Sequence, residues 1–294
     1  MTRIITALII TTALAVLCVS AQAIDYTQLS SAKRLRADKR YDEAVQKLKG
    51  MAAKTDEVGE NFTYLDLALD IAVDSLKDEK RALALAAAVK EPAYRDFAKL
   101  RVLADFERYD EALAFVKGKD IDAWPVRCRS QAHSILAGIY HAKKDTASEL
   151  QQWQLTADSA GAEIGVRGRA LCELGVLHLK QGHVKEAEEQ FRKAVQVTDA
   201  NYAWRVQSLV SLSRLLVESQ RGREAVKAFE GTDFTKVTSL TSRANLIEAY
   251  ARALLAAGRK IKAIETFDQL LQLDIPAEWK DRINQELDQM AETF

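Results

Sequence analysis

The stretch "LGVLHLKQGHVKEAEEQF", residues 174–191, reads as the end of one helix, a short turn and most of a second helix. Gly175 lies inside the first helix, where glycine is about 1 kcal/mol less favourable than alanine. Two antiparallel helices that pack roughly 8–10 Å apart need small residues where their backbones approach. We therefore expect Gly175 and Ala187 to lie at a close helix contact, with the ring of Phe191 filling the space beside them.

The same pattern recurs along the chain. From Ala112 onward, residues equivalent to Ala187 follow one another at intervals of 37 or 38 residues, which is typical of stacked supersecondary repeats. The equivalent positions are Ala44, Ala82, Ala112, Leu150, Ala225 and Ala263. The small residue at Gly175 recurs as Gly138, Ser213 and Ala251.

The motif L-G-x-x-H, followed by Gly182, A-x-x-x-F and Ala194, resembles the tetratricopeptide repeat, with His178 in the usual tyrosine position. The resemblance covers residues 26–272, clearly in the last four repeats and weakly in the first three. It implies an all-α fold, a right-handed superhelical solenoid of about seven antiparallel helix pairs. The period of about 38 residues exceeds the 34 that are usual in this family, which predicts longer helices.

The repeats and a terminal helix account for residues 24–294. The repeats are expected at residues 26–57, 58–91, 92–122, 123–161, 162–200, 201–236 and 237–275. The three prolines, Pro92, Pro125 and Pro276, are each expected at the first position of a helix, where a missing N–H is harmless. A capping helix is expected over 276–294, because Trp279, Ile283, Leu287 and Met290 form one apolar stripe on a charged helix.

Residues 1–23 have the pattern of a secretory signal peptide. Arg3 precedes an apolar run over residues 4–19, and Ala21-Gln22-Ala23 fits a cleavage site. An uncleaved membrane anchor would need about 20 apolar residues, and acylation of Cys18 would need a small residue in place of Leu17. The pattern favours cleavage and export, either to a bacterial periplasm or by secretion.

The remaining cysteines, Cys128 and Cys172, both fall in helical segments. An oxidising compartment would join them if they were accessible to each other. We expect both to be small buried apolar residues, and a single Cys128–Cys172 disulfide stays open as the alternative.

Composition and motifs indicate neither nucleic-acid binding nor catalysis. The chain has 42 basic and 42 acidic residues, and no phosphate-binding loop or hydrolase motif. We therefore expect a protein that is not an enzyme and needs no cofactor or metal. His141 and His178 occupy equivalent positions, and packing between helices is favoured over a shared metal. The glycosylation pattern at Asn61 is interpreted as chance.

The resemblance implies that the first helix of each pair lines a concave groove. The candidate groove residues are Tyr94, Arg101, Lys143, Arg169, Lys180, Arg214, Asn245 and Arg252. The same stripe also contains Phe97, Ile135, Ile139, Cys172, Val176, Gln207, Val210 and Glu248. Six of these residues are basic, which favours an acidic or carboxylate-bearing ligand, although Asp105 and Glu218 lie nearby. The alternative is that these residues are only solvated helix faces.

These observations predict an exported scaffold that binds a protein or peptide through the groove, with no stable membrane insertion after signal cleavage. The alternative function is a dedicated accessory subunit that docks onto an envelope enzyme or secretion complex. Both interpretations rest on the fold by analogy, since no motif names the partner.

Overall fold

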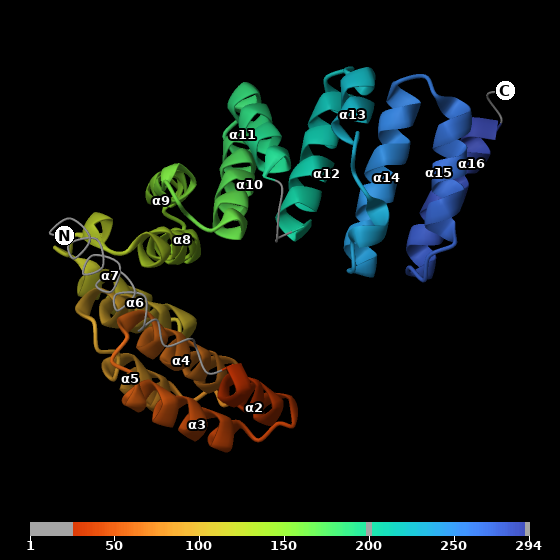
Figure 1. Cartoon of the computed structure of the whole chain (residues 1–294). Coiled ribbons are helices and arrows are strands. Elements are labelled where there is room, and N and C mark those ends of the chain that lie inside the picture. Colours follow the sequence, from red (N-terminus) through yellow and green to blue (C-terminus); the bar gives the residue numbers. More distant parts are fainter. Residues whose placement is uncertain (1–25, 198–201, 292–294) are drawn as a thin grey trace, which may run out of the picture. The chain divides into compact units, whose positions relative to one another are not determined.

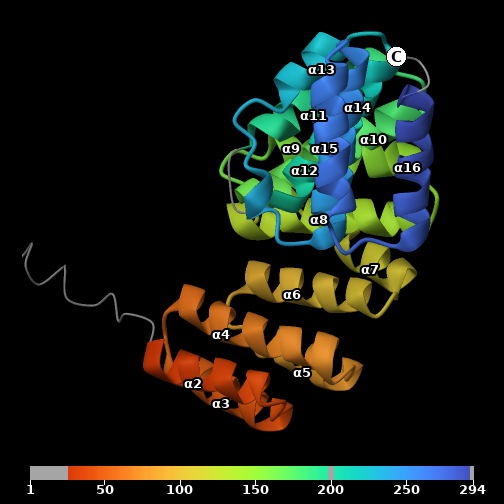
Figure 2. The same cartoon turned by 90° about the vertical axis from the view of Figure 1, so that its right-hand side faces the viewer.

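A computed structural model describes residues 26–197 and 202–291, so the expected signal peptide and its cleavage site lie outside the described residues. Within these two ranges the chain forms fifteen α-helices and no strand. Successive helices form seven antiparallel pairs, and one further helix follows them (Figures 1 and 2). The all-α fold of about seven helix pairs and a terminal helix is therefore confirmed.

The chain divides into two compact units, one ending at Lys117 and the other beginning at Gly118. The first unit contains α2 (Tyr26–Ala37), α3 (Tyr41–Lys54), α4 (Val58–Asp70), the π-helical turn η1 (Ile71–Ser75), α5 (Glu79–Ala87), α6 (Pro92–Asp105) and α7 (Tyr109–Val116). The boundary follows the third, weakly patterned repeat. The sequence repeat continues across it and does not reveal it.

The second unit contains the clearly patterned repeats. Its elements are η2 (Ile121–Ala123), α8 (Val126–Ala142), α9 (Thr146–Asp158), α10 (Ile164–Lys180), α11 (Val184–Gln196), α12 (Tyr202–Glu218), α13 (Gly222–Ala228), η3 (Phe234–Lys236), α14 (Leu240–Ala256), α15 (Lys260–Leu271) and α16 (Ala277–Ala291). The first helices of the four pairs, α8, α10, α12 and α14, each have 17 residues and begin 38 residues apart. The long first helix thus accounts for much of each 38-residue repeat.

An arginine recurs in the first turn of each of these helices, at positions 129, 167, 205 and 243. Arg129 donates to the carbonyl of Asp122 at 3.0 Å. Arg243 donates to the carbonyl of Val237 through Nε at 3.0 Å and Nη2 at 2.9 Å. In these two repeats, the arginine ties the helix to the loop that precedes it.

The contact that explains Gly175 is confirmed. A Cβ atom added to Gly175 would lie 2.5 Å from Cε1 of Phe191 and 2.6 Å from its Cδ1, closer than a real Cβ can approach. Both Phe191 and Ala187 are fully buried. The expectation does not extend to Gly138, which has no atom within 4 Å of an added Cβ, because no phenylalanine follows at the equivalent position. At the next equivalent position, Ser213 Oγ donates instead to the carbonyl of Ala249 on α14 at 3.3 Å.

Every helix pair turns through one residue with a positive φ angle. These residues are Lys39, Lys77, Glu107, Lys144, Gly182, Gln220 and Gly258, with φ between 53° and 78°. In the turn after α10, His183 N–H donates to the His178 carbonyl at 2.8 Å and Gly182 N–H donates to the Leu179 carbonyl at 3.0 Å. This is the Schellman pattern of helix ends, in which glycine is the favoured left-handed residue.

A Gln220→Gly variant is expected to raise the free energy of unfolding by about 0.5–1 kcal/mol. The left-handed conformation costs a residue with a Cβ roughly 1–2 kcal/mol, part of which is offset by the greater freedom of glycine in the unfolded chain. Gly182→Gln, at the equivalent turn and with no atom near its added Cβ, is the matched control and should be destabilising. Urea unfolding followed by circular dichroism measures both, and a less stable Gln220→Gly variant would contradict the backbone argument.

Several other expectations can be compared with the structure. Pro92 is the first residue of α6, but Pro125 and Pro276 each precede their helix by one residue, so these two positions were wrong by one. Cys128 and Cys172 are both buried free thiols, and burial raises the pKa of Cys172 to about 11. The disulfide alternative is thereby excluded in this structure.

The side chain of Asn61 is also buried in the first unit. Its amide donates to the Ala52 carbonyl at 3.0 Å and accepts from the Lys90 N–H at 3.1 Å. Because both ends of the amide are used inside the protein, the structure agrees with the interpretation of its glycosylation pattern as chance.

Candidate functional site

The two candidate groove residues of the first unit are used in internal contacts. Tyr94 packs on Phe62, with ring centroids 4.5 Å apart. Arg101 is held by Asp66 at 2.7 Å, by Asp70, and by Asp105 at 3.5 Å. The arginine was expected to offer a positive charge to a ligand, but three carboxylates on neighbouring turns already neutralise it.

Arg169, in the second unit, also points into the protein. Its guanidinium carbon lies 5.1 Å from the ring centroid of Trp153 and 5.3 Å from that of Trp204. Cation–π contacts on both sides therefore hold the side chain. Lys180 is the exposed last residue of α10, and Lys143 is the exposed residue that follows α8. The expected row of cations is thus divided among different environments.

Three other members of the predicted stripe do not face solvent. Phe97, Ile139 and Cys172 are at most 2% exposed and belong to the helix-packing surfaces. The period of 38 residues is not a whole number of helical turns, so a stripe defined by a constant step along the sequence crosses from the exposed face into the core. These three residues were wrongly assigned to the groove.

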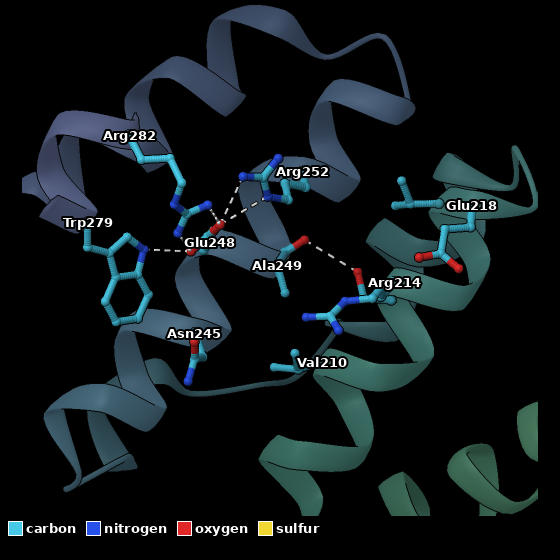
Figure 3. Close-up of a pocket in the computed structure, with 11 residues that line it drawn as sticks. Val210, Arg214, Glu218, Asn245, Glu248, Ala249, Arg252, Trp279 and Arg282 are labelled. Atoms are coloured by element: carbon cyan, nitrogen blue, oxygen red, sulfur yellow. Dashed lines mark hydrogen bonds and ion pairs between the residues drawn. The ribbon is translucent and has the colours of Figure 1, made fainter. Parts of the chain in front are cut away.

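The remaining three candidates come together. Arg214, Asn245 and Arg252 line a pocket of about 600 Å³ between α12, α14 and α16, entirely within the second unit (Figure 3). The other lining residues are Val210, Ser213, Val217, Glu218, Glu248, Ala249, Trp279 and Arg282. The first helices of two successive repeats and the terminal helix therefore form the walls.

Glu248 is the centre of a polar network that joins α14 to α16. Its carboxylate accepts from Arg252 Nη2 at 2.9 Å, from Arg282 Nη1 at 2.8 Å and from Trp279 Nε1 at 2.7 Å. Burial would raise the pKa of Glu248, but these three donors outweigh it and leave the pKa below its usual value. Glu248 is therefore held as a carboxylate.

Arg252 is paired on its other side as well. Its Nη1 and Nη2 donate to the two carboxylate oxygens of Glu286 on α16, each at 2.9 Å, in a bidentate arrangement. Two carboxylates therefore neutralise this arginine. Its inclusion as a free groove cation was an error that the sequence offered no means of avoiding.

Arg214 differs from Arg252 although it occupies the equivalent position one repeat earlier. Among the described residues, no hydrogen bond or ion pair is made by the guanidinium of Arg214, by the side-chain amide of Asn245 or by the carboxylate of Glu218. Figure 3 shows Arg214 reaching into the pocket opposite Glu248. The pocket thus keeps one unpaired guanidinium and one unpaired amide.

The chemistry that this arrangement supports is binding. Val210, Val217 and Ala249 supply an apolar wall, and the indole of Trp279 supplies an aromatic one. A guanidinium and an amide can together donate several hydrogen bonds to one carboxylate. The pocket therefore fits an acidic group attached to an apolar side chain.

Sequence reasoning did not include Trp279 and Arg282 among the groove residues. Both lie on α16, which was interpreted only as a cap. The available signal was their position on the polar side of a helix whose buried residue is Ile283. A helix that follows a repeat array occupies the place of a next first helix, so its polar face continues the groove.

No cluster suited to a metal ion is formed by the described histidines, cysteines and carboxylates. His141 pairs with Glu149, with His141 Nδ1 and Glu149 Oε1 3.0 Å apart, while the ring of His178 lies 6.0 Å from that of His183. None of the described helices has the length and apolar character needed to cross a membrane.

Comparison with known proteins agrees with the repeat pattern. Residues 168–201 match the family model described as Tetratricopeptide repeat. No curated protein gives a significant match. Among solved structures, a tetratricopeptide repeat protein of Parabacteroides merdae is 14% identical over 88% of this chain and 96% of its own, with a TM-score of 0.43. TPR-like repeats of a Podospora anserina protein described as a kinesin light chain are 18% identical over 62% of this chain and 95% of theirs, with a TM-score of 0.43.

The family match supports the resemblance for the residues that it covers, which include Gly175 and Phe191. Tetratricopeptide repeats are helical scaffolds for protein–protein interaction, and the matched repeat gives the chain that general character. The match says nothing about the partner.

Proposed function

We propose, from the tetratricopeptide repeat at residues 168–201 as premise, that the second unit is a non-catalytic binding module for an acidic segment of a partner protein. The observation that carries this proposal is the unpaired guanidinium of Arg214 in the pocket between α12, α14 and α16. A carboxylate of the partner would bind Arg214 and Asn245, and a neighbouring apolar side chain would lie against Val210 and Val217.

The setting that we propose is the bacterial envelope. The apolar run and the Ala21-Gln22-Ala23 pattern favour export, and a mature chain with little net charge suits a scaffold in the periplasm. In that setting the partner would be another envelope protein, which the array holds as part of an assembly.

Peptide binding tests the proposal. The probes are fluorescein-labelled hexapeptides with one glutamate next to a leucine or valine, each with a counterpart in which glutamine replaces the glutamate. Wild-type protein should bind the glutamate peptides more tightly in fluorescence anisotropy. Arg214→Gln should remove about tenfold or more of that preference, because a hydrogen bond to a charged group contributes roughly 1.5–3 kcal/mol.

Arg223→Gln is the matched control, since Arg223 is an exposed arginine on α13 that does not line the pocket. It should bind both sets of peptides as wild-type protein does. Binding without any preference for glutamate, or an equal loss in both variants, would contradict the proposal.

A further inference from the structure

The pocket contains one repeat of an arginine–glutamate arrangement. Arg214 and Arg252 lie 38 residues apart on equivalent first helices, and Glu248 and Glu286 are separated by the same interval. Arg252 on α14 binds Glu286, which lies 34 residues later on the following helix, through two hydrogen bonds of 2.9 Å. The residue 34 positions after Arg214 is Glu248, on the helix that follows α12.

The equivalent pair is nevertheless not formed. Glu248 accepts instead from Arg252, from both terminal nitrogens of Arg282 at 2.8 and 3.0 Å, and from Trp279 Nε1 at 2.7 Å. Figure 3 shows the carboxylate turned toward these donors, with no contact to Arg214 across the pocket. Arg214 therefore lacks a partner because its expected acceptor is engaged by α16.

We infer that Glu248 is an alternative, intramolecular ligand of Arg214, and that Arg282 and Trp279 of α16 keep the carboxylate site at Arg214 open by binding Glu248. The inference rests on the proposed function, because the site that stays open is the one proposed for the partner's carboxylate. Arg282 and Trp279 are positioning residues in this scheme. They act through Glu248.

The hydrogen-bonding capacity of a carboxylate explains why the two states exclude each other. Two carboxylate oxygens offer about four acceptor sites, and the donors from Arg252, Arg282 and Trp279 already occupy them. If the donors on α16 were removed, Glu248 would keep its charge, half-buried beside an unpaired guanidinium. Pairing with Arg214 would then be the favourable arrangement, as in the Arg252–Glu286 pair.

The attachment of α16 makes this arrangement suitable for regulation. Ile283 is the one buried side chain among the described side chains of α16, in contrast to the six buried residues of α14. Polar contacts to Glu248 and Arg252 thus make up much of what holds α16 in place. A partner or condition that displaces α16 would release Glu248 and close the site at Arg214.

The first test measures binding of the labelled glutamate hexapeptides. The Trp279→Phe, Arg282→Gln double variant should bind them about tenfold more weakly, which corresponds to an open site in one molecule out of ten. Adding Glu248→Gln should restore the affinity, because a neutral side chain cannot neutralise Arg214. Unchanged binding in the double variant would overturn the inference. Weak binding that Glu248→Gln does not restore would overturn it too, since Arg282 would then contact the ligand directly.

A second test needs no ligand and separates this inference from the proposed function. Thermal midpoints are measured for Arg214→Gln, Glu248→Gln and their combination, in the wild-type background and in the Trp279→Phe, Arg282→Gln background. The two substitutions should be additive in the wild type and non-additive in the second background, where the two residues pair. Additivity in both backgrounds would overturn the inference even if peptides bind. Failure of the peptides to bind, with this coupling present, would overturn only the proposed function.

Discussion

Replacing Phe191 with alanine is expected to lower the free energy of unfolding of the second unit by about 3–5 kcal/mol. Phe191 is fully buried, and its ring covers Gly175 on the facing helix of the same pair. It also belongs to the cluster that contains Ala187, Val206 and Leu209, which joins α11 to α12. Removal of the ring therefore leaves a cavity at a contact within one repeat and at a contact between two repeats.

The sign of a second substitution makes this prediction specific. Gly175→Ala in the wild type should be destabilising by about 1–3 kcal/mol, because its Cβ would lie 2.5 Å from the ring of Phe191. In the Phe191→Ala background the clash is absent, and the greater helix propensity of alanine should make Gly175→Ala stabilising, by about 1 kcal/mol.

Gly138→Ala is the matched control for this pair. Gly138 occupies the equivalent position on α8, and no atom lies within 4 Å of its added Cβ, so the substitution should be stabilising in the wild type. Urea unfolding measured by circular dichroism follows all four variants, and amide hydrogen exchange locates the loss, which should be greatest in α10, α11 and α12. A Gly175→Ala variant as stable as Gly138→Ala would show that the ring does not lie on the glycine.

The fold could be predicted from the sequence because its cause is local and repeated. Small residues at Gly175 and Ala187, with Phe191 four residues after the alanine, specify one helix pair, and the 38-residue interval copies it. The recurring arginine at positions 129 and 243 carries the same kind of signal and was available at the same interval. Its role depends on a carbonyl in the preceding loop, which no side-chain pattern indicates.

The candidate site could be predicted only in part, because its character depends on contacts between distant segments. Arg214 and Arg252 are indistinguishable in the repeat pattern, yet Glu286 neutralises one and no described residue neutralises the other. Arg101 is similar, since Asp66 lies two helices earlier in the chain. A sequence shows which residues share a helix face. Which charges remain unpaired is decided by helices packed beside that face.

A substitution at Gly222 should produce the other large loss of stability, at the upper end of the roughly 1–3 kcal/mol typical of overpacking. Gly222 is the buried first residue of α13. A Cβ atom there would lie 2.2 Å from the carbonyl carbon of Ala256 and 2.3 Å from its oxygen, at the end of α14. These neighbours are backbone atoms, which cannot turn aside as a flexible side chain does. Gly222→Ala would therefore force α13 and α14 apart.

The comparison within the repeat series supports this expectation and supplies the control. The equivalent first residues of α11 and α15 are Val184 and Lys260, so a glycine is required here by the close approach of α13 to α14 and not by the turn itself. Arg223→Ala changes the next, exposed residue and should alter the free energy of unfolding by less than about 0.5 kcal/mol. Since α14 carries Asn245, Glu248 and Arg252, Gly222→Ala should also weaken peptide binding, measured by anisotropy under conditions where the variant is folded. A Gly222→Ala variant with wild-type stability would mean that α13 and α14 are farther apart in solution, and the pocket wall would then have to be redrawn.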